Sequence, residues 1–222
     1  MRRTPVYIVS SPRPGVGKTL LSRLLTEFQK LHKGTVAAFD INLREPSLLD
    51  YQPRVTETAD ISDTHGQMAL MDRLIVNDGL PKVIDLGFHA FDDFFTMIDE
   101  IGFIKEADRR GVDPIILFIP DATRPSSLAW DMLRQTFPRS ALIPVNNEHA
   151  LWGQNLPLFS EVRTLKVAAL PAFLKSIISR TTFSFTDYLR TAKDSSSELH
   201  QWTRDNYTHF REIELNLMLH KL

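Results

Sequence analysis

The sequence contains no cysteine. This absence excludes disulfide frameworks, thiolate metal sites and cysteine nucleophiles, and it permits a reducing compartment. A bound metal ion would need oxygen or histidine ligands. An excess of charge is missing too, because 26 Lys and Arg face 27 Asp and Glu, for a formal net charge of -1. Any nucleic-acid contact must therefore come from a local basic patch and not from a basic chain.

Long hydrophobic runs are also absent. The first apolar stretch, residues 6–9, is far too short for a signal sequence or a membrane span, and no later run approaches that length. Acidic and basic side chains balance one another over the last predicted helix, whereas helices that lie on membranes are usually rich in Lys and Arg. We therefore expect a soluble, cytoplasmic protein without a membrane partner.

What the sequence does contain is enough apolar material for a core. The 222 residues are 43% hydrophobic and 24% charged, close to the globular average, which excludes a fully disordered or fibrous chain. The chain is shorter than the length at which a second core becomes the default. We expect a single domain over residues 1–222, with a C-terminal helical extension over about residues 195–222.

Short apolar runs alternate with helical patterns along the chain. Strands are predicted at residues 6–11, 35–41, 82–87, 114–120 and 140–147, with a weaker one at 164–171. Helices are predicted at residues 18–33, 67–76, 91–110, 126–137, 172–179 and 195–222, and a loop-rich stretch precedes residue 67. Because the strands are continuously apolar, they predict an α/β fold with a mostly parallel β-sheet flanked by helices on both faces.

A glycine-rich turn stands between the first predicted strand and the first predicted helix. Its residues are Gly15, Val16, Gly17, Lys18 and Thr19. Glycine lets backbone N–H groups approach a phosphate closely, and a helix N-terminus favours negative charge. Lys18 can reach the terminal phosphates, and the Thr19 hydroxyl can ligate a phosphate-bound magnesium ion. The turn predicts a phosphate site, although Pro12 replaces the first glycine of GxxxxGK[ST]; the alternative is a glycine-rich turn with an incidental lysine.

The surrounding segment, SPRPGVGKTLLSRLL, resembles the deviant Walker A loop, KGGxGKT, of the ParA and MinD-like ATPases. The resemblance implies a three-layer P-loop NTPase fold that binds ATP and Mg2+. The implied nucleotide contacts are Gly15, Val16, Gly17, Lys18, Thr19 and Leu20. Arg13 falls where the family has its signature lysine, which contacts the phosphates, often across a dimer interface, so Arg13 and Lys18 are implied catalytic residues. Arginine binds phosphate as a planar fork, and Pro14 replaces a family glycine.

Two aspartates follow predicted strands and resemble acidic positions of the same family. Asp40 looks like the position linked to the attacking water and magnesium, which implies a catalytic role. The family usually carries two aspartates there, whereas Ala38 or Asn42 occupies the second position, and the alternative for Asp40 is an aspartate that caps a loop. Asp85 ends the strand at 82–87 in the manner of a Walker B motif, so that Thr19 and Asp85 are the implied magnesium ligands.

Two late positions resemble the base pocket of the family. Asn146 ends the predicted strand at 140–147, where the family asparagine reads the adenine edge through an amide that both donates and accepts. Pro171 follows Leu170 in a segment similar to the family's late Ile-Pro element, whose backbone lies near the base. For both positions the alternative is an ordinary turn at the end of a strand.

Cations outnumber acids between residues 161 and 193. They could bind the DNA backbone without sequence preference, and the alternative is an ordinary solvated face. The cations are Arg163, Lys166, Lys175, Arg180, Arg190 and Lys193.

The leading hypothesis is a slow, magnesium-dependent ATPase that works as a nucleotide-switched homodimer in partitioning or positioning of DNA or other cellular cargo, as the ParA/MinD resemblance implies. Catalysis would consist of charge neutralisation by Lys18, Arg13 and magnesium, with water oriented by Asp40.

A second hypothesis is an ATP-dependent small-molecule ligase or kinase similar to dethiobiotin synthetase, which needs a substrate pocket beside the phosphates. A third is a non-catalytic regulatory or scaffolding protein that binds nucleotide without turning it over, which Pro12, Pro14 and the single Asp40 favour. Besides the homodimer, non-specific DNA or a partner protein is a possible partner.

Overall fold

A computed structural model gives the structure of the chain and describes residues 3–42, 47–137, 141–151 and 164–219. Its seven strands form one sheet in the order β3-β2-β4-β1-β5-β6-β7, and every neighbouring pair is parallel. The strands are β1 (Thr4–Ser10), β2 (Ala37–Ile41), β3 (Thr56–Thr58), β4 (Lys82–Leu86), β5 (Val112–Phe118), β6 (Ala141–Asn147) and β7 (Leu165–Val167). The predicted α/β fold with a parallel sheet is confirmed.

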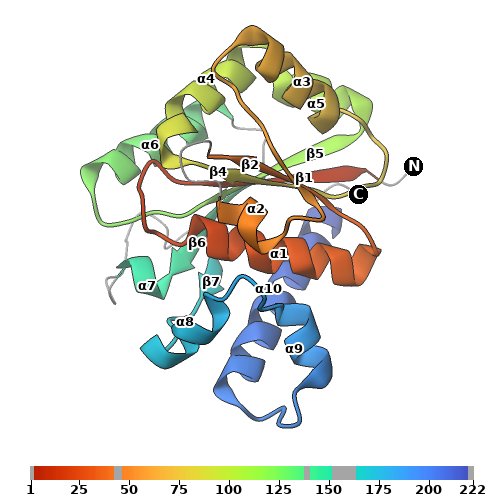
Figure 1. The fold of residues 1–222 in the computed structure, drawn as a ribbon. Helices are drawn as coiled ribbons and strands as arrows, with labels where there is room; N and C mark the ends of the chain where they lie inside the picture. Colours follow the sequence, from red (N-terminus) through yellow and green to blue (C-terminus); the bar gives the residue numbers. More distant parts are fainter. Residues whose placement is uncertain (1–2, 43–46, 138–140, 152–163, 220–222) are drawn as a thin grey trace.

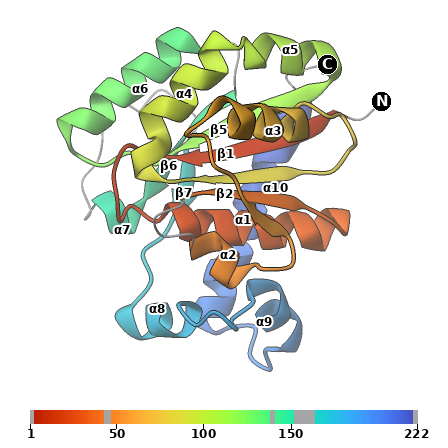
Figure 2. The same cartoon turned by 45° about the horizontal axis from the view of Figure 1, so that its top comes forward.

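Helices cover both faces of this sheet. They are α1 (Lys18–Lys33), α2 (Ser47–Tyr51), α3 (Thr64–Leu74), α4 (Phe91–Glu100), α5 (Phe103–Arg110), α6 (Arg124–Thr136), α7 (Glu148–Leu151), α8 (Ala172–Ile178), α9 (Phe185–Thr191) and α10 (Glu198–Leu219), with a 3-10 turn η1 (Phe88–Ala90). Figures 1 and 2 show α3 to α6 on one face and α1, α2 and α8 to α10 on the other. The molecule therefore has three layers.

Alternation along the strands divides the apolar side chains between two cores. Tyr7 and Val9 of β1 pack into the cluster that contains α1 and α10, whereas Val6 and Ile8 pack into the cluster that contains α3 to α6. All four side chains are buried. Because successive side chains of a strand point to opposite faces, a strand covered on both sides must be apolar throughout, as these strands are.

Several predicted elements differ from those in the structure. The predicted helix at 91–110 is two helices, because Gly102 adopts a left-handed φ of +64° between α4 and α5. The stretch before residue 67, predicted as a loop, contains α2 and β3, and α9 lies where no element was predicted. The weak strand at 164–171 is shorter, since β7 ends at Val167. Elements of three to seven residues carry too few positions for a periodic pattern to identify them.

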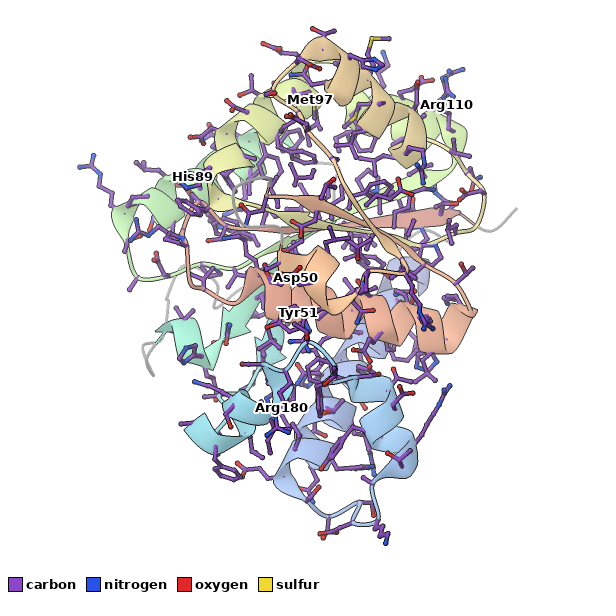
Figure 3. The ribbon with its side chains drawn as sticks, viewed as in Figure 1. Asp50, Tyr51, His89, Met97, Arg110 and Arg180 are labelled. Carbon is purple, nitrogen blue, oxygen red and sulfur yellow. The ribbon has the colours of Figure 1, made fainter. Side chains whose placement is uncertain are left out.

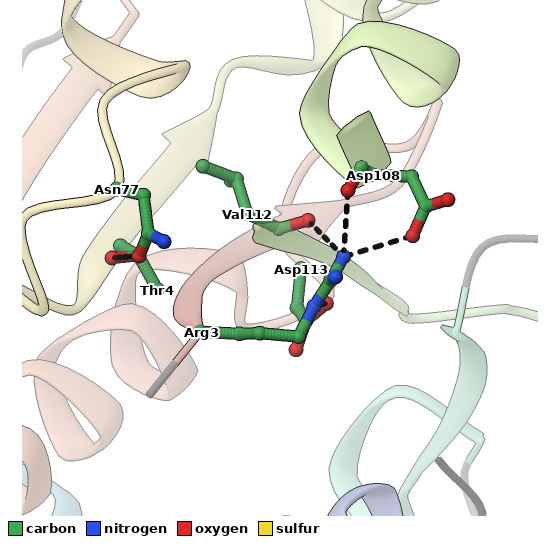
Figure 4. A network of polar contacts seen from close by, with 6 residues as sticks. All are labelled: Arg3, Thr4, Asn77, Asp108, Val112 and Asp113. Atoms are coloured by element: carbon green, nitrogen blue, oxygen red, sulfur yellow. Dashed lines mark hydrogen bonds and ion pairs between the residues drawn. The ribbon is translucent and has the colours of Figure 1, made fainter. Parts of the chain in front are cut away.

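The amino end of the central strand β1 is fixed to β5 and α5 by one arginine (Figure 4). The guanidinium of Arg3 lies 2.6 Å from the carboxylate of Asp113 and 2.9 Å from that of Asp108. It also donates to the backbone carbonyl of Val112 at 3.1 Å. These contacts hold β1 at the centre of the sheet, so that its other end delivers the following loop to the carboxyl edge, where ligands of open α/β sheets bind.

The C-terminal helix α10 packs against α1. The rings of Tyr207 and Phe210 lie 5.5 Å from the ring of Phe28, measured between centroids. Beside them, the amide of Gln29 donates to the buried carboxylate of Glu214 at 3.0 Å. The apolar side of α10 therefore covers the helix that follows the glycine-rich loop. Within the described part of the chain, no helix combines the length and apolar character needed to cross a bilayer.

Candidate functional site

The loop between β1 and α1 has the backbone geometry that its glycines permit. Gly15 and Gly17 have φ values of +71° and +92°, a region that residues with side chains disfavour. A Cβ on Gly17 would also lie 2.5 Å from Nδ2 of Asn147. Among the described residues no side chain caps the start of α1, and its first turn carries no acid. The first N–H groups of this 16-residue helix are therefore available to an anion.

Lys18 is the first residue of α1 and lies half-buried beside the loop. Its ammonium group donates to the carbonyl oxygen of Arg13 at 2.7 Å. Burial lowers the pKa of Lys18 to about 8, and the nearby carboxylate of Asp85 opposes this shift. A phosphate group beside the ammonium would favour its charged form. The loop thus holds the predicted phosphate-binding lysine next to the start of α1.

Thr19 and Asp85, the two predicted magnesium ligands, lie in direct contact. The Thr19 hydroxyl donates to Oδ2 of Asp85 at 2.7 Å, and the Ser22 hydroxyl donates to Oδ1 at 3.0 Å. The carboxyl group is buried at the end of β4. Burial raises the pKa of Asp85 to about 6, although both hydroxyl donors favour the carboxylate. These are hard oxygen atoms of the kind that Mg2+ prefers.

Asp40 lies fully buried at the end of β2 and holds the start of α2. Its Oδ2 accepts from the backbone amides of Leu48 at 2.8 Å and Leu49 at 3.2 Å. Burial raises the pKa of Asp40, and these backbone hydrogen bonds oppose the shift. The contacts correspond to the capping alternative, because the carboxylate satisfies N–H groups that a helix start leaves open. The predicted role of Asp40 in orienting water remains a prediction.

Arg13, predicted to contact phosphate, is paired with an acid of its own chain. Its Nε lies 3.1 Å from Oδ2 of Asp121, which follows β5. The other carboxylate oxygen of Asp121 accepts from the backbone amide of Thr123 at 3.0 Å. The side chain of Arg13 is 40% exposed. It is therefore held at the rim of the loop by a contact that the sequence did not predict.

Two cavities meet at the start of α1. The one beside the charged side chains has a volume of about 300 Å³. Its lining includes Pro14, Gly15, Gly17, Lys18, Thr19, Leu20, Asn42, Ser47, Asp85 and Gly87. We call it the phosphate cavity, because the predicted phosphate and magnesium contacts line it. Among the described residues no three acidic or histidine side chains gather into a metal site. A magnesium ion here would depend on phosphate oxygens for further ligands.

The second cavity, of about 290 Å³, lies on the side of β6 and β7. It shares Gly17, Thr19, Leu20 and Ser47 with the phosphate cavity. Its remaining lining comes from Arg23, Tyr51, Asn147, His149, Val167, Ala168, Leu170, Lys175, Ile178, Ser179 and Trp202. We call it the apolar cavity. The two cavities thus lie beside each other at the start of α1, the first lined by charged side chains and the second mostly by apolar ones.

Arg23 and Tyr51 form the wall of the apolar cavity that faces α2. The guanidinium of the buried Arg23 lies 3.6 Å from the ring centroid of Tyr51 and donates to the carbonyl of Ile178 at 2.9 Å. The Tyr51 hydroxyl donates to the carbonyl of Ser179 at 3.2 Å. Figure 3 shows Tyr51 on the face of the sheet that carries α8, toward the segment with Arg180. These contacts join α1, α2 and the end of α8.

Known proteins resemble this chain in fold and not in sequence. Neither a model of a known protein family nor a curated protein sequence matches it. A plasmid partition protein from Borrelia burgdorferi superposes with a TM-score of 0.52 at 11% identity, over 95% of this chain and 99% of that one. The chain has a P-loop NTPase-like fold.

Two further structures superpose on this P-loop fold less closely. They are the MinD cell division protein of Aquifex aeolicus and the chloroplast FtsY of Physcomitrella patens. The first has a TM-score of 0.49 at 15% identity, over 94% of this chain and 97% of that one. The second has a TM-score of 0.48 at 14% identity. The superposition covers 77% of this chain and 59% of the length of the FtsY chain.

On this P-loop fold the structure brings together most of the predicted site residues. Gly15, Gly17, Lys18, Thr19 and Leu20 line the phosphate cavity with Asp85, and Val16 lies buried beneath the loop. Asn146 and Pro171 are not among the described residues that line either of the two cavities, although the neighbouring Asn147 and Leu170 line the apolar one. The predicted base contacts of Asn146 and Pro171 stay predictions.

Strand alternation explains why Asn147 and not Asn146 lies in the apolar cavity. Val145 packs into the core that contains α1, and Asn147 is two residues further along β6, so both face α1. The Asn147 amide donates to the carbonyl of Val16 at 2.8 Å. The alternation places Asn147 on the same face as Val145, but the structure is needed to show that this face carries α1. No sequence signal identifies Arg23, Tyr51 or Trp202, because they come from three separate helices.

The basic stretch near residues 161–193 is partly neutralised. The ammonium of Lys166 lies 3.0 Å from the carboxylate of Glu148, and Lys175 lines the apolar cavity. Arg163 lies outside the described residues. Three cations of the predicted patch, Arg180, Arg190 and Lys193, are exposed. The predicted DNA contact therefore has fewer unpaired cations than the sequence alone suggested.

Proposed function

We propose that the protein is an ATP-binding, magnesium-dependent ATPase that works as a nucleotide-switched homodimer. The contact between the Thr19 hydroxyl and the Asp85 carboxylate, with Lys18 beside it at the start of α1, carries this proposal. Three features are needed to hold a magnesium-bound triphosphate: open N–H groups, a cation, and hard oxygen ligands. All three lie around one cavity of this P-loop fold.

The donor set fits both groups that the proposal requires. A bound Mg2+ supplies positive charge to the phosphates and positions them. The chain's own contribution is to hold the phosphates on the first N–H groups of α1 and to place the Lys18 ammonium against them, where burial strengthens the interaction. Thr19 and Asp85 would hold the ion, and Arg13 would add charge after leaving Asp121. Catalysis would consist of positioning and charge neutralisation, with little covalent chemistry for the protein to perform.

The switch would act through α2. Asp40 holds the start of α2 through two backbone amides, and the Ser47 hydroxyl lies 3.1 Å from the hydroxyl of Thr19. A magnesium ion that draws on Thr19 would therefore act on the first residue of α2. Ordering of such loops by the terminal phosphate is a common device of nucleotide switches. The dimer and the partitioning or positioning of DNA or other cargo rest on the ParA/MinD resemblance of the loop, with which the fold of the plasmid partition protein agrees.

A small cavity beside the phosphate cavity bears on the ligase or kinase alternative. It has a volume of about 140 Å³, shares Asn42 and Gly87 with the phosphate cavity, and is also lined by Asp60, His89 and Asp93. Ligand pockets usually begin at roughly 300 Å³. This cavity is small for a typical second substrate, and we place the ATPase first. A co-substrate that accelerates ATP turnover without DNA or a partner protein would reverse this order.

Calorimetry with ATP and magnesium tests the proposal, with light scattering on the same samples to follow dimer formation. We expect wild type to bind ATP and dimerise. Loss of the Lys18 ammonium should weaken binding about a hundredfold in Lys18→Ala, because a charge-assisted contact in a half-buried site is lost. Lys105→Ala, which removes an exposed lysine of α5, is the matched control. No binding by wild type would refute the ATPase and leave only the fold; binding without phosphate release would favour the scaffold.

A further inference from the structure

The apolar cavity raises the question of which base it would accept. This inference rests on the proposed function, in which the phosphates lie against the start of α1. The cavity shares Gly17 and Thr19 with the phosphate cavity and has a mostly apolar wall, so it is where the nucleoside of a bound triphosphate would lie. A base is selected by hydrogen-bonding groups that the wall leaves unused. The hydrogen bonds that the polar groups of the wall already make therefore limit which base could bind.

Asn147, the asparagine that lines the apolar cavity, already makes hydrogen bonds within the chain. Nδ2 of Asn147 donates to the carbonyl of Val16 at 2.8 Å, and its Oδ1 accepts from the backbone amide of His149 at 3.2 Å. The same amide group is what a Cβ on Gly17 would meet. Asn147 therefore joins the end of β6 to the glycine-rich loop through Nδ2 and to α7 through Oδ1. A base could form a hydrogen bond with Asn147 only in addition to these two bonds.

Other polar groups of the wall also bond within the chain, although Nε of the buried Arg23 has no hydrogen-bond partner among the described residues. Arg23 donates to the carbonyl oxygens of Ile178 and Phe183, at 2.9 and 3.4 Å, and stacks on Tyr51. The hydroxyl of Ser179 donates to the carbonyl of Lys175 at 2.7 Å.

The backbone that follows β7 is likewise occupied. The carbonyl of Ala168 accepts from Nε1 of Trp202 at 2.8 Å, and the amide of Ala169 donates to the carboxylate of Glu148 at 3.1 Å. Two backbone groups near the resembled Ile-Pro element are thus bound to the chain itself.

Lys175 differs from these groups because its ammonium carries three donor hydrogens and contacts His149. It is half-buried on α8, and its ammonium lies 2.9 Å from Nδ1 of His149. An ammonium has three hydrogens and no lone pair, so it must donate here, and the ring nitrogen must accept. His149 therefore acts as a positioning residue that holds the ammonium at the cavity. Two of the three ammonium hydrogens remain for a ligand.

We propose that Lys175 is the base-reading side chain of the apolar cavity and that it selects purines by their acceptor atoms. A lysine ammonium matches the O6 and N7 acceptors of a 6-oxopurine, whereas adenine presents a donor amine at position 6 and only N7 as an acceptor on that edge. The site therefore accepts 6-oxopurine triphosphates at least as tightly as ATP. Base choice is set by α8, far along the chain from the glycine-rich loop.

Binding of ATP and inosine triphosphate tests this assignment, because the two differ in the base only around position 6. Calorimetry in magnesium should give a dissociation constant for inosine triphosphate no larger than that for ATP. Lys175→Met, which keeps the length of the side chain, should weaken inosine triphosphate binding about tenfold and ATP binding less, since a charged donor to O6 is lost. Lys175→Arg, which keeps donors, should retain the wild-type order. Lys193→Met removes an exposed lysine outside the cavity and should change neither constant.

The outcomes separate the inference from the proposed function. Tighter binding of ATP than of inosine triphosphate by wild type would overturn the inference, and so would an unchanged ratio of the two constants in Lys175→Met. In both cases the triphosphate site itself would stand. If wild type bound neither nucleotide, the proposed function would fail first. Circular dichroism of each variant establishes that α8 and the rest of the fold are intact.

Discussion

The phosphate cavity and the apolar cavity are nearly equal in volume, about 300 and 290 Å³, but they are built in different ways. The phosphate cavity draws most of its chemistry from one short loop, the first turn of α1 and the end of β4. The wall of the apolar cavity comes from α1, α2, β6, α7, β7, α8 and α10. Phosphate recognition needs closely spaced backbone donors, which a local turn supplies, whereas a base needs a surface that only tertiary packing assembles.

The two cavities also differ in how they treat buried charge. In the phosphate cavity burial lowers the pKa of Lys18 to about 8 and raises that of Asp85 to about 6, so both charges are held at a cost that ligands would relieve. In the apolar cavity burial lowers the pKa of Arg23. The charge of this guanidinium is already stabilised by stacking on Tyr51 and by hydrogen bonds to two carbonyl oxygens. Ligands would therefore neutralise buried charges in the phosphate cavity, whereas in the apolar cavity the charge of Arg23 is already stabilised within the chain.

The largest effect should come from the apolar cavity, in Arg23→Ala. The change leaves the carbonyl oxygens of Ile178 and Phe183 without their donor and removes the stacking on Tyr51. We expect the free energy of unfolding to fall by about 3 kcal/mol, the sum of a lost cation–π contact and unsatisfied buried acceptors. Urea denaturation measures it. Arg180→Ala, an exposed arginine of the neighbouring segment, should cost little; equal costs for the two changes would contradict the structural role of Arg23.

The next effect belongs to the phosphate cavity and is a pH dependence. The pKa of Asp85 is about 6 in the folded chain and ordinarily 3.8, so between pH 4 and pH 6 the folded state holds a proton that the unfolded state has released. Stability from this group is thus present at low pH and lost as the pH rises through 6. Relative to Asp85→Asn, wild type should lose about 2 kcal/mol of unfolding free energy between pH 4 and pH 6.5. Asp93→Asn, at an exposed site, controls for general charge; parallel curves for wild type and Asp85→Asn would refute the shift.

Gly17 lines both cavities, so Gly17→Ala tests whether they act as one site. Its φ of +92° and the 2.5 Å approach of Nδ2 of Asn147 leave no room for a Cβ. A left-handed residue with a side chain costs roughly 1–2 kcal/mol, and displacement of Asn147 adds to it. We expect triphosphate affinity to fall about a hundredfold by calorimetry, since loop donors and cavity wall move together.

A matched control for Gly17→Ala lies at the other end of α1. Gly34 has a φ of +81°, and a Cβ there would meet nothing within 4 Å. Gly34→Ala should therefore reduce stability through the same backbone strain and leave nucleotide affinity unchanged. If both substitutions reduced affinity equally, the loss would come from general strain in α1 and not from the site.

The same contrast explains what could be predicted from the sequence. Lys18, Thr19 and Asp85 follow strands of a parallel sheet, and such residues meet at one edge whatever the details of the fold, so their meeting was predictable. Asp40 was predicted at the correct strand end, but its contact with α2 was not, because α2 has only five residues and no periodic signal. The choice between Asn146 and Asn147 required knowing which face of β6 carries α1.

The wall of the apolar cavity lay beyond sequence reasoning for a different reason. Trp202 and Lys175 reach it from α10 and α8, and their helical spacing shows only that each helix has an apolar face. Which residues of those faces meet Gly17 depends on how the helices pack over α1. That packing is set by contacts such as those of Phe28 with Tyr207 and Phe210, each far apart in sequence. No local pattern encodes them.

The smallest effect concerns Arg13, whose pairing with Asp121 competes with the phosphate role predicted for it. Asp121→Asn keeps the shape of the side chain and removes its charge, so Arg13 becomes free to turn toward the phosphate cavity. The pair is partly exposed and contributes at most about 1 kcal/mol, so stability should barely change. Triphosphate affinity should rise about threefold, because the contact with Asp121 no longer has to be broken.

A double-mutant cycle decides whether that gain comes through Arg13. In an Arg13→Met background, Asp121→Asn should no longer raise the affinity, because no guanidinium is left to release. A gain that persists without Arg13 would assign it to the loop after β5, where Asp121 also binds Thr123. No gain in either background would mean that Arg13 stays at the rim of the loop when nucleotide binds. The phosphate cavity would then rely on Lys18 as its cation, and the likeness of Arg13 to a signature lysine would be one of position without function.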